Sequence, residues 1–169
     1  PVAGFFEEAL EAAIDAQKFI IDLALSKYQE VWLSVRPGNH DKIAGFATYL
    51  VLRERYRHEV EAGRLVLGDA KLEADFWQFG KCMFMCTHGD KYSPSRPLKI
   101  QSLMATDQPE MWGATNYREA HFGHVHHENV LEIDGCKLLT HPILAPQDRW
   151  HWGEMYRSLS GMSVRTYHE

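Results

Sequence analysis

Three short apolar runs in this chain each end close to a turn that contains glycine and histidine. The runs lie at residues 31–35, 81–87 and 119–122, and polar side chains follow each of them. Short apolar runs that end at glycine or proline are typical of buried strands. In α/β folds, ligands bind beyond the carboxyl ends of the strands. The pattern therefore predicts an α/β fold in which polar loops from distant parts of the chain meet.

The sequence around these runs predicts helices and further strands. A long helix is expected over residues 5–29. Ile14, Ile21 and Leu25 fall at helical spacing on one face of it, as in a helix packed against a core. Asp134-Gly135 is the favoured two-residue turn of a hairpin. The other expected elements are a helix over 43–61, strands over 64–67 and 76–79, a helix over 100–106, hairpin strands over 129–133 and 137–140, and a last strand over 163–167.

Size and composition limit the class of protein. The chain has 169 residues, 45% of them hydrophobic, which predicts one folded domain over residues 1–169. No apolar run approaches the roughly 18 residues that span a bilayer, so no membrane partner is expected. The formal net charge of −5 provides no overall attraction for duplex nucleic acid. The odd number of cysteines predicts buried thiols in a reducing compartment, with the cytoplasm as the expected location; they are Cys82, Cys86 and Cys136.

Three motifs contain the candidate functional residues: Gly38-Asn39-His40-Asp41, Thr87-His88-Gly89-Asp90 and Gly123-His124-Val125-His126. They supply an amide oxygen and several imidazoles, which borderline divalent ions accept together. The histidines of the third motif are two residues apart, so in an extended segment both would point the same way. Taken singly, Asn39 also fits a plain turn residue, and His88 a hydrogen-bonded surface group at a strand end. The ordered set is the stronger signal.

In this order the three motifs resemble those of the calcineurin-like metallophosphoesterases. The resemblance implies an α/β sandwich, with two sheets packed face to face, helices outside and a metal site at one edge. That family opens with Asp-x-His and Gly-Asp-x-x-Asp motifs, and neither precedes Gly38 here. Gly68-Asp69 comes later, with Leu72 where a second carboxylate would stand, and is interpreted as a strand-end turn. We therefore expect an N-terminally truncated phosphoesterase domain that lacks its first strand and crossover.

The resemblance also implies two divalent metal ions. Asn39, His88 and His124 match ligands of one ion, and His126 matches a ligand of the other. The family's bridging aspartate belongs to the opening motifs. Manganese is the first expectation, and iron, zinc, nickel and cobalt also suit these ligand types.

The resemblance assigns roles to three further residues. His40 matches the general acid, or positive group, that faces the leaving oxygen, a role suited to a histidine near neutral pH. Asp41 is expected to orient the ring of His40. Asp90 is expected to orient His88 in the same way.

The implied function is metal-dependent phosphoester hydrolysis, with phosphodiesters, nucleotides or DNA as the substrates considered. The alternative is a non-catalytic scaffold of the same fold with an incomplete metal shell. An unpaired sheet edge would invite pairing with another chain, so a homo-oligomer or a missing N-terminal segment is a candidate partner. The aromatic residues near the C-terminus would stack a base, form a lid or serve self-association; they are Trp150, Trp152 and Tyr156.

Overall fold

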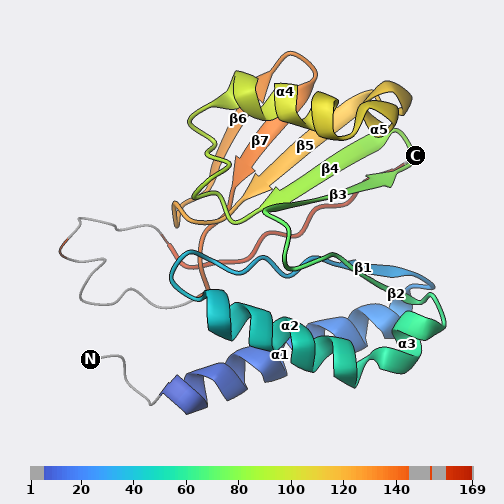
Figure 1. Cartoon of the computed structure of the whole chain (residues 1–169), viewed down its shortest axis with the longest axis vertical. Helices are drawn as coiled ribbons and strands as arrows, with labels where there is room; N and C mark the ends of the chain where they lie inside the picture. Colours follow the sequence, from blue (N-terminus) through green and yellow to red (C-terminus); the bar gives the residue numbers. More distant parts are fainter. Residues whose placement is uncertain (1–5, 145–152, 154–158, 169) are drawn as a thin grey trace. The chain divides into compact units, whose positions relative to one another are not determined.

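The computed structural model describes residues 6–144, 153 and 159–168 (Figure 1). Its contacts divide the chain into two compact units, residues 1–72 and 73–169. Helices and strands alternate in the first unit, and the second contains a mixed sheet with helices. The α/β class predicted from the sequence is therefore confirmed. The single domain over 1–169 and the face-to-face packing of two sheets stay predictions.

The first unit contains two parallel strands and three helices. The strands pair in parallel, with Val31 opposite Leu65. Tyr56 (φ −107°, ψ 26°) interrupts the helix expected over 43–61, and its hydroxyl donates to the Asp22 carboxylate at 2.8 Å. The elements are α1 (Phe6–Lys27), β1 (Val31–Leu33), α2 (Lys42–Arg55), α3 (Arg57–Glu61) and β2 (Leu65–Leu67).

The core of the first unit lies between α1, α2 and the short sheet. Ile21, Leu52, Tyr56 and Leu65 are buried together. Burial and the hydrogen bond to Asp22 raise the pKa of Tyr56 to about 12, so this hydroxyl remains a donor at any physiological pH. The long N-terminal helix is thus confirmed, together with the face that it buries.

The second unit is built on a five-stranded mixed sheet with strand order β3-β4-β5-β7-β6. Strands β4, β5 and β7 are parallel to one another, whereas β3 and β6 run antiparallel at the two edges. Helix α4 lies along one face of this sheet (Figure 1). The elements are β3 (Ala74–Phe79), β4 (Cys82–Thr87), α4 (Pro97–Asp107), α5 (Pro109–Ala114), β5 (Tyr117–Phe122), β6 (Asn129–Ile133) and β7 (Cys136–Thr140).

Strand β4 is covered on both faces, as its apolar sequence predicted. Met83 and Met85 pack in a core with Ile100 and Met104 of α4. On the opposite face, Phe84 stacks on Trp77 with ring centroids 5.4 Å apart. The strand that ends at His88 is therefore held from both sides.

The hairpin around Asp134-Gly135 is confirmed, with β6 and β7 paired antiparallel and Gly135 at φ 70°. Gly68-Asp69 is a strand-end turn, as predicted, because the Leu72 amide donates to the Asp69 carbonyl at 3.1 Å. The strand expected over 163–167 is wrong, because residues 159–168 have no regular secondary structure. Their polar side chains bind the sheet face instead of extending its ladder, as described below.

The sequence also makes predictions about the cysteines and about membrane-spanning helices. All three cysteines are free thiols, and Cys136 is buried, which raises the pKa of its thiol to about 11. The prediction of buried thiols is confirmed for Cys136, whereas Cys82 and Cys86 are partly exposed. Within the described residues, no helix has both the length and the apolar character that crossing a bilayer requires.

Candidate functional site

The structure brings His88 and His124 together beyond the carboxyl ends of β4 and β5, two neighbouring strands inside the five-stranded sheet. Strands β4 and β5 are parallel neighbours, and their last residues, Thr87 and Phe122, are register partners. The loops that follow them therefore leave the sheet side by side. The His88 and His124 rings lie edge to face, with centroids 5.1 Å apart and planes at 73°. Two of the sequence-predicted ligands thus share one position in the fold.

Two glycines allow this close approach. Gly89 is buried and has φ +109°, a conformation that residues with a Cβ rarely adopt. A Cβ on Gly89 would lie 3.4 Å from the carbonyl oxygen of Gly123, and one on Gly123 would lie 3.3 Å from that of His88. The two loops therefore pack backbone to backbone.

The segment from Gly123 to His127 is a tight turn, so the prediction of an extended His124–His126 pair is wrong. His124 has φ 62° and His126 has φ 57°. The Val125 amide donates to the Gly123 carbonyl at 2.7 Å, two residues back. Left-handed conformations in residues other than glycine are uncommon and are enriched at functional sites. The two side chains therefore owe their directions to the turn rather than to strand alternation.

Neighbouring groups fix this turn to strand β7. The His127 Nδ1 atom lies 2.8 Å from the Val125 carbonyl, so Nδ1 is the protonated donor. The hydroxyl of Thr140 donates to the His127 carbonyl at 2.7 Å, and the His141 amide donates to the Phe122 carbonyl at 2.9 Å. The loop that presents His124 and His126 is thus bonded within itself and to the sheet.

The Gly38–Asp41 loop lies in the first unit, between β1 and α2. Asn39, His40 and Asp41 are exposed, whereas Gly38 is buried. The Asp41 carboxylate accepts a hydrogen bond from the Gly38 amide, and the Asp41 amide donates to the Gly38 carbonyl at 3.3 Å. Asp41 therefore closes the turn around Asn39 and His40. Its orientation of the His40 ring stays a prediction.

A second glycine contact supports the same loop. Gly45 lies in the first turn of α2, and a Cβ there would be 3.0 Å from both Cα and Cβ of Pro37. The Gly45 amide also donates to the Asp41 carbonyl at 2.7 Å. The chain before Asn39 therefore packs directly on the helix that follows Asp41, and only glycine leaves room for it.

The donor types fit part of a metal shell. His88 and His124 offer two imidazoles in mutual contact, whereas metal sites of this chemistry use four or more ligands. Over the described ranges, no group of three or more His, Cys, Asp or Glu side chains is arranged to hold a metal ion. Asn39 and His40 belong to the other compact unit, so their convergence with His88 and His124 stays a prediction, as does the metal role of His126.

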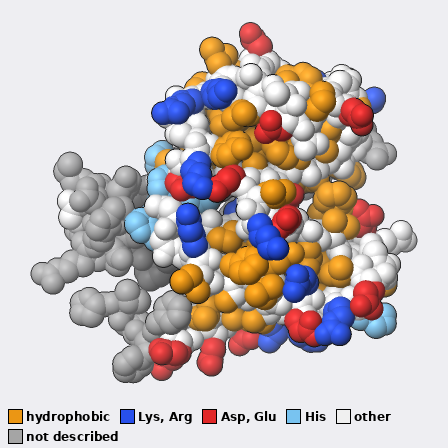
Figure 2. Space-filling model, in the orientation of Figure 1, with side chains coloured by type: hydrophobic (Ala, Val, Ile, Leu, Met, Phe, Trp, Pro, Cys, Tyr) orange, Lys and Arg blue, Asp and Glu red, His pale blue; other side chains and the backbone are white. Residues whose placement is uncertain are grey.

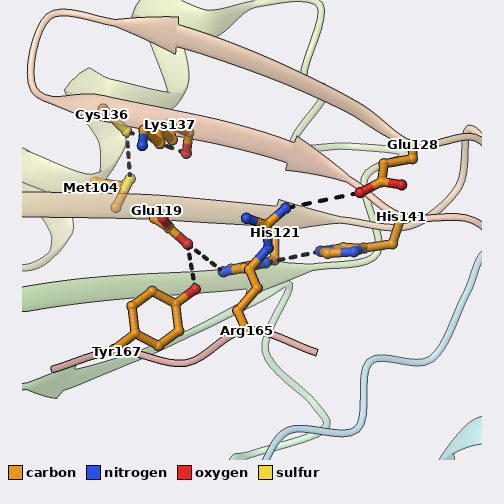
Figure 3. A network of polar contacts seen from close by, with 9 residues as sticks. All are labelled: Met104, Glu119, His121, Glu128, Cys136, Lys137, His141, Arg165 and Tyr167. Carbon is orange, nitrogen blue, oxygen red and sulfur yellow. Dashed lines mark hydrogen bonds and ion pairs between the residues drawn. The ribbon is translucent and has the colours of Figure 1, made fainter. Parts of the chain in front are cut away.

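A polar network lies on β5, β7 and the C-terminal segment (Figure 3). The His121 Nδ1 and His141 Nε2 atoms are 2.9 Å apart, and the two rings are stacked with planes at 9°. One ring donates its hydrogen to the other, so the accepting ring is neutral when the pair is intact. Burial, together with the nearby charges of His141 and Arg165, lowers the pKa of His121 to about 4.

Glu119 links this histidine pair to the C-terminal segment. The Tyr167 hydroxyl donates to Glu119 Oε2 at 2.6 Å, and His121 Nε2 lies 3.6 Å from the same oxygen. The Tyr167 ring also meets Phe84 edge to face at 4.8 Å. Arg165 lies 4.0 Å from Glu128. These side-chain contacts, rather than a strand ladder, hold residues 163–167.

From the sequence, His121 is interpreted as a structural residue or a neighbour of the metal ligands, and nothing in the spacing requires His141 at the site. Glu119 and Tyr167 have no predicted role. One signal was present: Glu119 and His121 are two residues apart in a strand, so they share a face. Tyr167 lies far away in the chain, and nothing local connects it to β5.

The remaining predicted residues have separate positions. Asp90 lies in a bend after His88, and its orientation of His88 stays a prediction. The next residue, Lys91, forms an ion pair with Glu73, which raises the pKa of the Lys91 amine. Trp150, Trp152 and Tyr156 lie outside the described residues.

No protein-family model matches the chain, and no curated protein matches it. Two solved structures are similar to it. One is a conserved uncharacterized protein from Streptococcus pneumoniae TIGR4, described as a predicted phosphoesterase. The likeness covers 71% of this chain and 75% of that one, at 14% identity and a TM-score of 0.33. The other is a double mutant of Vps29 from Entamoeba histolytica. This likeness covers 73% of this chain and 63% of the Vps29 chain, at 17% identity and a TM-score of 0.40. With TM-scores below 0.5, the functional proposal depends on the residues themselves.

Proposed function

We propose that this chain is a metal-dependent phosphoester hydrolase that acts on phosphodiesters. The observation that supports the proposal is the meeting of His88 and His124 at the ends of two neighbouring parallel strands, with ring centroids 5.1 Å apart. The motif order predicted that these two histidines would share a site, although 36 positions of the sequence separate them.

The donor set suits this chemistry. Two divalent ions, when bound, neutralise phosphate oxygens and make a water nucleophilic at neutral pH. His88 and His124 would hold one ion together with the Asn39 amide oxygen, and His126 would hold the other. The attacking oxygen forms a new bond to phosphorus while the bond to the leaving oxygen breaks. His40 would donate the proton that the leaving oxygen needs.

Small phosphodiesters and nucleotides fit the proposal better than long duplexes do. A formal net charge of −5 offers no general attraction for a polyanion. Near His88, the positive charge of Lys91 is already paired with the carboxylate of Glu73. Within the proposed site, the metal ions are the groups that would bind the phosphate.

Hydrolysis of bis-p-nitrophenyl phosphate with manganese tests the proposal. The assay compares this chain with its single-residue variants. The substitutions His88→Ala in the second unit and Asn39→Ala in the first should each lower kcat/KM by at least about 100-fold, because each removes a proposed ligand. His58→Ala, on exposed helix α3, is the matched control and should retain activity.

Two results would contradict the hydrolase. Unchanged turnover in His88→Ala would remove the proposed site. Manganese binding without turnover would favour the non-catalytic scaffold, the alternative function for this fold.

A further inference from the structure

Helix α1 has an exposed apolar face opposite the face that it buries. Ile21 and Leu25 pack into the core of the first unit. Phe19, Ile20 and Leu23 are instead 69%, 45% and 46% exposed. Leu23 lies roughly 160° around the helix from Ile21, at 3.6 residues per turn. A helix with apolar side chains on two opposite faces normally has partners on both.

The exposed face continues towards the start of the helix in small residues. Ala9, Ala12, Ala13 and Ala16 are all exposed, and at helical spacing they form one stripe with Phe19, Ile20 and Leu23. The side chains of the stripe are therefore small in the first half of the helix and large in the second.

We propose that this stripe binds helix α1 of a second copy of the chain, antiparallel, about a two-fold axis at Ala16. In that arrangement, residues equally far from Ala16 in opposite directions face each other. Phe19 then lies opposite Ala13, Ile20 opposite Ala12 and Leu23 opposite Ala9. Each large side chain meets an alanine, so the two helices interdigitate closely.

Charge favours the same orientation. The first half of α1 contains only acidic charges, whereas both lysines, Lys18 and Lys27, lie in the second half with one aspartate, Asp22. An antiparallel pair sets each acidic half beside the half that contains the lysines, and it opposes the helix dipoles. A parallel pair would set acidic half against acidic half. The acidic residues are Glu7, Glu8, Glu11 and Asp15.

Helix α2 shows that exposure alone does not make this pattern. Hydrophobic side chains also reach the surface over α2, among charged ones (Figure 2), with Ile43 88% and Val51 45% exposed. An antiparallel α2 pair would set Ile43 against Val51, two large side chains. The α2 face therefore lacks the size complementarity of α1.

The occupant is a second copy rather than a lipid surface. Interfacial helices usually have lysine and arginine on their polar face, whereas α1 has five acidic residues and two lysines. The interface is short, because a 22-residue helix is about 33 Å long. A single helix pair lies at the low end of interface size, so dissociation constants on the order of micromolar are expected.

Sedimentation equilibrium of the whole chain tests the dimer. The unsubstituted chain should dimerise in the micromolar range, and Phe19→Glu should weaken dimerisation at least about tenfold, because it buries a charge against Ala13. Ile43→Glu, at an exposed position on α2, should leave the dimer intact. Circular dichroism should match for all three chains, because both substituted side chains are exposed. A chain that stays monomeric at about 100 µM, well above the expected constant, would overturn the proposal, as would equal disruption by Ile43→Glu.

Cysteine cross-linking tests the orientation. Under mild oxidation Ala16→Cys should form a covalent dimer, because the two copies of residue 16 meet at the axis. Leu23→Cys should not, because its two copies would be about 20 Å apart along the helices at 1.5 Å per residue. The unsubstituted chain, with its own three cysteines, gives the background. Equal cross-linking at both positions would overturn the antiparallel pair. The unsubstituted chain should not bind phosphatidylcholine–phosphatidylserine vesicles. If it binds them and Phe19→Glu abolishes the binding, a lipid surface rather than a second copy occupies the stripe.

Discussion

The imidazoles of His88 and His124 meet edge to face, with their centroids 5.1 Å apart. His88 is the first residue after β4 and His124 the second after β5, and the register of these strands sets Thr87 opposite Phe122. A slip of one residue in that register would move one side chain to the other face of the sheet. The contact is thus a consequence of strand pairing, and the pairing is fixed by the buried residues on both faces of β4.

Replacement of Gly45 by alanine should disturb the Gly38–Asp41 loop. Alanine favours a helix over glycine by about 1 kcal/mol, but here its Cβ would lie 3.0 Å from Pro37. We expect the steric contact with Pro37 to outweigh this gain in helix propensity, so that the free energy of unfolding falls by about 1–2 kcal/mol. Denaturant unfolding measures it.

Gly113 provides the matched control for Gly45. It lies in α5, and a Cβ there would meet nothing within 4 Å. Gly113→Ala should therefore gain up to about 1 kcal/mol of stability. Equal effects of the two substitutions would contradict the role of the Pro37 contact.

Replacement of Gly89 by alanine should weaken metal binding as well as stability. The φ of +109° imposes strain of about 1–3 kcal/mol on any other residue, and the added Cβ would lie 3.5 Å from the Cβ of His124. Gly63→Ala is the control, because its φ is also positive, at +70°, but nothing lies within 4 Å. Calorimetric titration with manganese should show weaker binding for Gly89→Ala only. Equal weakening in both variants would mean that strain alone is responsible.

Stability should fall between pH 6.5 and pH 4 through His121. Burial holds the pKa of His121 near 4 in the folded chain, whereas an unfolded histidine titrates near 6.5. Within this window the unfolded state binds more protons, so its free energy drops as the pH falls. The stabilisation is fully present above pH 6.5, and its loss approaches roughly 3 kcal/mol by pH 4.

The variant His121→Gln separates this effect from the titration of carboxylates. Denaturant unfolding at pH 7, 5.5 and 4.5 should give a shallower pH dependence for the variant than for the unsubstituted chain. The groups that face His121 are His141, Arg165 and Glu119, and the substitution leaves them in place. Parallel pH profiles would contradict a neutral buried His121.

Local sequence predicted the elements whose signals are short in range. Strand β4 was evident from its unbroken apolar run, and the β6–β7 hairpin from Asp134-Gly135. Helix α5 was not among the predicted elements; Pro109 begins it, where proline lacks no needed hydrogen bond. At the break between α2 and α3, the Tyr56 hydroxyl bonds to Asp22 in another helix, a contact that no local pattern contains.

The candidate site shows the same division. The positions of His88 and His124 after strands were predictable, and parallel pairing brings them together. The turn at residues 123–127 was not predictable, because His124 and His126 adopt left-handed conformations, whereas local preference favours extended backbone. The expected strand at 163–167 failed because Tyr167 and Arg165 contact Glu119 and Glu128 through side chains, and these partners are remote in the sequence.

Anomalous scattering from crystals grown with manganese tests the central claim most directly. Data collected on either side of the manganese absorption edge would show where the ion binds. The account predicts an anomalous peak within coordination distance of the imidazole nitrogens of His88 and His124 and the amide oxygen of Asn39. A manganese-loaded crystal with no peak at these three side chains would contradict it.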